Sequence, residues 1–60
     1  MTKQEYKNLY SLLSPAEKQE CNNYHMERLV LGTITGDGET VGIATQCLAW
    51  IAEYEEEAQK

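Results

Sequence analysis

The chain has 60 residues, of which 42% are hydrophobic, and its ten acidic residues outnumber five basic ones to give a formal net charge of −5. This length allows a single domain, 1–60, with a small core, and the acidic balance argues against nucleic-acid binding. The polar N-terminus and the lack of an apolar run of about 20 residues predict a cytoplasmic protein with neither a secretory signal nor a membrane span.

The first predicted element is a helix over about residues 3–13. Thr2 and Glu5 have the spacing of a capping box, in which each residue satisfies a backbone amide of the other. One narrow apolar stripe follows at helical spacing, formed by Tyr6, Leu9, Tyr10 and Leu13. Lys3, Lys7 and Asn8 lie off this stripe, so the helix is amphipathic.

A second helix is predicted over about residues 15–31. Ser14 is a good N-cap, Pro15 suits the first helical position, and Glu17 completes another capping box. Gly32 is the expected C-cap. The first half of this helix is polar, but its last turns are apolar nearly all round, which indicates that they need cover on two sides.

A glycine-rich loop over 32–39 is expected next, with Asp37 as the N-cap of a third helix over about 40–58. The third helix has the broadest apolar arc of the chain, formed by Val41, Ile43, Ala44, Cys47, Leu48, Trp50, Ile51 and Tyr54. The sequence therefore predicts an all-α fold, a small three-helix domain. The alternative is an α+β fold with a β-hairpin at 29–45, because Val, Ile and Thr are frequent there.

The third helix ends in an acidic cluster. Carboxylates at a helix C-terminus oppose the helix dipole, and Glu53 and Glu57 repel each other at a spacing of four. The pattern predicts that the last turn frays.

Few residues suggest chemistry. Cys21 and His25 have the i, i+4 spacing of metal ligands, and Cys47 and Glu17 could complete a set. However, the sequence has no CxxC motif and no second histidine. We expect two free, half-buried thiols, no catalytic residues, no cofactor, no metal and no small-molecule substrate.

The sequence favours a non-enzymatic protein–protein interaction module. Three short helices cannot cover every side of the apolar end of the second helix, and an exposed apolar patch marks a site for a protein partner or for self-association. The expected contact residues are Leu29, Val30, Leu31, Ile34, Trp50 and Tyr54. Small acidic helical proteins of this kind are typical of phage and mobile-element accessory proteins, and a homodimer is one expected form.

An acidic rim is expected around this apolar surface, formed by Glu39, Glu53, Glu55, Glu56 and Glu57. The same carboxylates support an alternative function, a DNA-mimic inhibitor of a nucleic-acid-binding protein. The apolar third helix separates the loop acids from the terminal ones, which favours an apolar contact with an acidic rim over a continuous acidic face.

Overall fold

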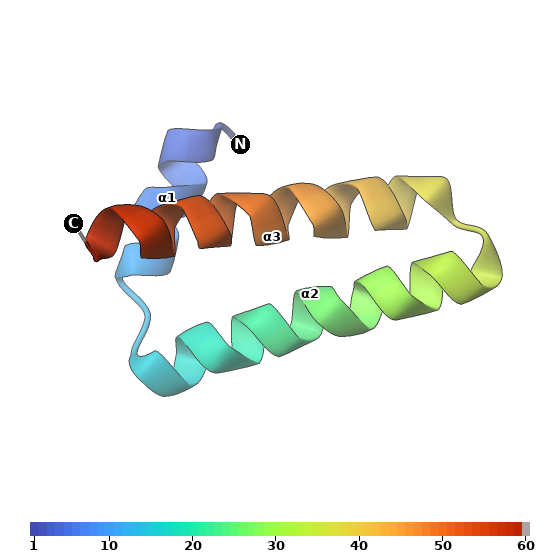
Figure 1. Ribbon diagram of the computed structural model, residues 1–60, viewed down its shortest axis with the longest axis horizontal. Coiled ribbons are helices and arrows are strands. Elements are labelled where there is room, and N and C mark those ends of the chain that lie inside the picture. Colours follow the sequence, from blue (N-terminus) through green and yellow to red (C-terminus); the bar gives the residue numbers. More distant parts are fainter. Residues whose placement is uncertain (60) are drawn as a thin grey trace.

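The computed structural model describes residues 1–59 and has three helices: α1 (Lys3–Ser11), α2 (Pro15–Thr35) and α3 (Gly38–Ala58). α2 and α3 form an antiparallel hairpin, and α1 crosses the C-terminal half of α3 (Figure 1). α3 packs against both other helices and is the centre of the fold. The predicted all-α three-helix domain is confirmed, and the described residues contain none of the strands that the α+β alternative required.

The predicted capping residues begin all three helices. Thr2 and Ser14 form complete capping boxes with Glu5 and Glu17. The Asp37 side chain accepts hydrogen bonds from the backbone amide of Thr40 at 3.2 Å and from its hydroxyl at 2.7 Å. Because each cap satisfies amides that lack a partner within the helix, these short local patterns fix where the helices start.

α1 ends at Ser11, two residues before the expected boundary. The backbone amides of Leu12 and Leu13 bond three residues back, to Leu9 and Tyr10, which tightens the final turn. Ser14 has an extended backbone, with ψ at 163°. The residue before a proline is driven out of the helical region, so the chain must leave the helix before Pro15.

The predicted end of the second helix is wrong. α2 continues through Gly32 to Thr35, and the C-cap is Gly36, whose φ of 74° is left-handed. A Cβ on Gly32 would lie 2.9 Å from Cγ2 of Val41, so this glycine permits the close approach of α2 to α3. Gly36 and Asp37 alone form the turn, which replaces the expected glycine-rich loop 32–39, and α3 starts at Gly38 in place of Thr40.

The core is small. The buried apolar residues are Tyr10, Ala44 and Ile51, and among the described residues no large side chain is completely buried. Tyr6 and Trp50 pack with ring centroids 5.4 Å apart, and Tyr54 meets Tyr10 edge-on at 5.3 Å. The core therefore contains few buried aliphatic residues, and an aromatic layer between α1 and α3 enlarges it.

Candidate protein-binding site

The C-terminal half of α2 presents an apolar surface to solvent, which we call the α2 face: Met26, Glu27, Val30, Leu31 and Ile34. The first four residues line an open groove of 440 Å³. Val30 and Leu31 are 54% and 55% exposed, and Ile34 is 75% exposed. Gly32 is buried close to Val41 of α3, and Leu29 is half-buried, so the helix also has apolar residues away from its exposed side. An apolar surface of this kind is suited to contact with another protein.

Three of the predicted contact residues, Val30, Leu31 and Ile34, lie together on this face, whereas Leu29 is half-buried on the inner side of the helix. Met26 is 51% exposed and belongs to the groove, but it was not among the predicted contact residues. Its position one helical turn before Val30 is the signal that would have identified it.

Trp50 and Tyr54 lie elsewhere, in the aromatic layer against α1. Both are half-buried. The ammonium group of Lys18 lies 5.3 Å from the ring centroid of Tyr54, within the range of a cation–π interaction. These two aromatic side chains hold α1 and α2 to α3, and they are separate from the α2 face.

The predicted acidic rim is divided between the two ends of the hairpin. Glu39 lies in the first turn of α3, directly after the turn that ends α2. Glu53, Glu55, Glu56 and Glu57 lie at the C-terminal end of α3, beside the start of α2 (Figure 1). The α2 face itself includes one carboxylate, Glu27.

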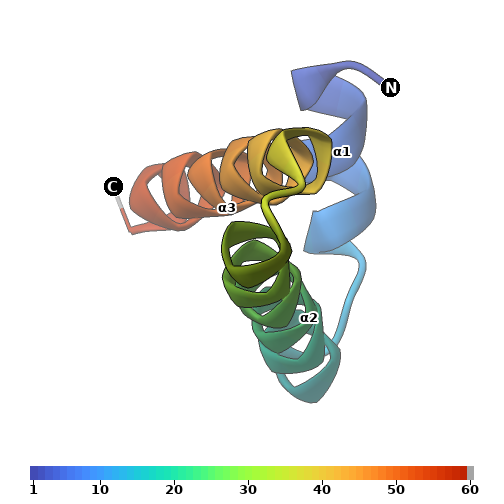
Figure 2. The same ribbon diagram turned by 90° about the vertical axis from the view of Figure 1, so that its right-hand side faces the viewer.

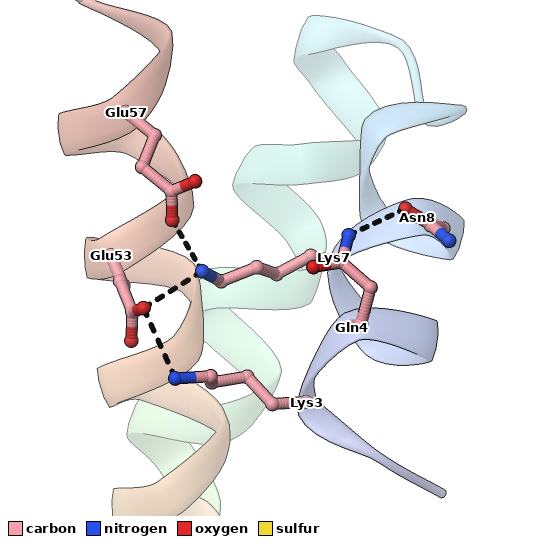
Figure 3. A network of polar contacts seen from close by, with 6 residues as sticks. All are labelled: Lys3, Gln4, Lys7, Asn8, Glu53 and Glu57. Carbon is pink, nitrogen blue, oxygen red and sulfur yellow. Dashed lines mark hydrogen bonds and ion pairs between the residues drawn. The ribbon is translucent and has the colours of Figure 1, made fainter.

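Most of the α3 carboxylates near the C-terminus contact groups on α1. Lys7 lies between Glu53, at 2.9 Å, and Glu57, and Lys3 reaches Glu53 at 3.2 Å (Figure 3). The Tyr10 hydroxyl donates a hydrogen bond to Glu55 at 3.3 Å. Burial and the Glu55 carboxylate raise the pKa of Tyr10 to about 12, so this donor keeps its proton.

Lys7 lies off the predicted apolar stripe of α1, yet its side chain is only 8% exposed. Its hydrogen bonds to Glu57 and Glu53 raise its pKa and so favour the charged form, and the Lys7 and Lys3 ammonium groups lower the pKa of Glu53. Lys7 thus places positive charge between two carboxylates that would otherwise repel each other. α3 is helical as far as Ala58, which includes the turn that was predicted to fray.

We expect Lys7→Met to lower the thermal stability of the chain more than Lys3→Met. Methionine keeps the apolar length of either side chain and removes its charge. Lys7 bridges two carboxylates from a nearly buried position, whereas the Lys3 side chain is 51% exposed and contacts one. Thermal melts followed by circular dichroism at low and high salt measure the difference, which should narrow at high salt. Equal losses for the two variants would show that the Lys7 bridge has no special role.

A polar cluster lies between α1 and α2. The Tyr6 hydroxyl is 2.9 Å from Nε2 of His25 and 3.7 Å from Sγ of Cys21. Burial raises the pKa of Tyr6 and lowers the pKa of His25, so a protonated hydroxyl can donate to a neutral imidazole. Burial also raises the pKa of the Cys47 thiol, which disfavours the reactive thiolate. Both cysteines are free.

The lowered pKa of His25 predicts that stability falls as the pH drops below neutrality. An unfolded histidine titrates near pH 6.5, and the folded chain holds His25 neutral to lower pH. Between these two pKa values the unfolded state binds more protons, so acidification favours unfolding. Urea titrations from about pH 7.5 to 5.5 should show this loss, and His25→Gln should flatten it. An unchanged pH dependence in the variant would contradict the assignment to His25.

The fold and the site together define a small three-helix all-α protein with an apolar face on its second helix. No known protein family model, no curated protein and no solved structure matches the chain. Across residues 1–59, no helix is long and apolar enough to cross a membrane. The same residues contain no group of three or more His, Cys, Asp or Glu side chains placed to hold a metal ion.

Proposed function

We propose that this chain is a non-enzymatic protein–protein interaction module that makes its contact through the α2 face. The observation that carries the proposal is the exposure of Val30, Leu31 and Ile34, each more than half accessible on consecutive turns of one helix. Covering side chains exposed to this degree favours binding by about 1 kcal/mol each. A cytoplasmic accessory protein of the phage or mobile-element type is the class of protein we propose.

The DNA-mimic alternative has less support. A mimic needs carboxylates that are free to meet a basic groove, whereas Glu53, Glu55 and Glu57 each contact a side chain of α1. Glu39 lies on the first turn of α3, at the opposite end of that helix. The carboxylates therefore do not form one continuous array.

The proposal is tested by capture from cells in which the chain occurs naturally, with mass-spectrometric identification of the bound proteins, untagged copies of the chain included. Val30→Glu places a charge in the centre of the α2 face. Gln19→Glu adds the same charge to the exposed N-terminal half of the same helix and is the matched control. We expect at least one protein captured by the wild type and the control to be lost with Val30→Glu. An identical set from all three would contradict a function of the α2 face.

A further inference from the structure

The chain leaves more surface exposed than a folded protein of its size usually does. Its accessible surface is 4370 Å² for 6.8 kDa, whereas the usual scaling for monomers gives about 3,950 Å². The excess of about 10% is roughly half of the 800 Å² or so that each partner buries in a standard interface. A chain this small often gains the missing cover from a second subunit.

The α2 face is free to receive another helix. In both views α2 lies at one edge of the molecule, with α1 and α3 on the same side of it (Figures 1 and 2). Met26, Val30 and Ile34 follow one another at intervals of four residues and form a single ridge along the helix. Ridges of this type pack into the grooves between the same ridges of a neighbouring helix.

This ridge is self-complementary in an antiparallel pair. A two-fold axis at Val30 sets Met26 of one chain against Ile34 of the other, about 6 Å along the helix on each side of the axis. Each copy then supplies the same apolar residues to the same contact, as a closed two-fold dimer requires.

The charges on the α2 face favour contact with a second copy of the chain in the antiparallel orientation. Glu27 is the one charged residue that lines the groove, so a strongly basic partner would find little to pair with there. In the antiparallel pair the two Glu27 residues lie about 9 Å apart along the helix axis, whereas a parallel pair in register would oppose them directly. The carboxylates bridged by Lys3 and Lys7 lie at the other end of the hairpin.

We infer that a second copy of this chain covers the α2 face, with the two α2 helices antiparallel about a two-fold axis at Val30. The inference rests on the proposed function and names the partner. It adds that the protein is a homodimer whose subunits close each other's exposed apolar surface.

Sedimentation equilibrium of the purified full chain tests this directly. The wild type should have twice the mass of 6.8 kDa, and Gln19→Glu should behave in the same way. Val30→Glu opposes two carboxylates at the axis and should weaken the association by about tenfold or more. A wild type that stays monomeric at every concentration would overturn the inference, and so would a dimer that Val30→Glu leaves intact. The capture experiment could still identify a different protein on the α2 face, so the two proposals fail separately.

Isotope-filtered nuclear Overhauser spectra of a mixture of labelled and unlabelled wild-type chains test the orientation without a substitution. We expect contacts between subunits from Met26 to Ile34 and from Val30 to Val30. Contacts from Met26 to Met26 would indicate a parallel pair, and contacts confined to α1 or α3 would indicate another interface. Either of these results overturns the proposed dimer.

Discussion

Ile51→Ala is expected to destabilise the chain by about 2–4 kcal/mol, because it removes a large part of a core that has few members. Ile51 is 3% exposed and belongs with Ala44 and Tyr10 to the small set of buried apolar residues. A domain of this length has a total stability of only about 3–9 kcal/mol. The substitution should therefore remove a large share of the total stability of the chain.

Ile43→Ala is the matched control, with the same chemical change on the same helix. Ile43 is 56% exposed, so its truncation should cost less than about 1 kcal/mol. Urea unfolding followed by circular dichroism compares the two variants with the wild type. If the two losses were equal, Ile51 would not be the core residue that the structure makes it.

The second large effect concerns two glycines within helices. Gly32→Ala should destabilise the chain by about 1–2 kcal/mol, although alanine is the better helix former. Its Cβ would lie 2.9 Å from Cγ2 of Val41 and 3.3 Å from the backbone oxygen of Asp37. Valine is stiff about χ1, and the backbone oxygen is fixed by the turn, so α2 and α3 must move apart.

Gly42→Ala should have the opposite effect and stabilise the chain by about 0.5–1 kcal/mol. Gly42 lies within α3, and a Cβ there would meet no heavy atom within 4 Å. Thermal and urea unfolding of the two variants give the signs directly. A stabilising Gly32→Ala would mean that the two helices are not in close contact at this glycine.

The sequence predicts the beginnings of the helices well because helix capping is local. Thr2, Ser14 and Asp37 each act within three residues of their own position. The end of α2 was not predictable in the same way. Gly32 and Gly36 are both plausible caps by residue type, and the choice depends on the distance between α2 and α3, which only the folded chain sets.

The site was predictable in part for a similar reason. Val30, Leu31 and Ile34 stand out because the end of α2 is apolar nearly all round and three short helices cannot cover every side of it. The roles of Lys7 and Trp50 depend on where α1 crosses α3, and helical spacing within one element does not reveal that crossing. A sequence signal for the role of Lys7 is the acidic end of α3, because a nearby cation relieves the repulsion between clustered carboxylates.

The most direct test of the α2 face is a series of amide nuclear magnetic resonance spectra of the wild-type chain recorded at decreasing concentration. We predict that the signals that shift on dilution come from Met26 to Ile34, as the covering helix leaves. Signals that stay fixed at all concentrations would contradict self-association through the α2 face, and so would shifts confined to the acidic end of α3.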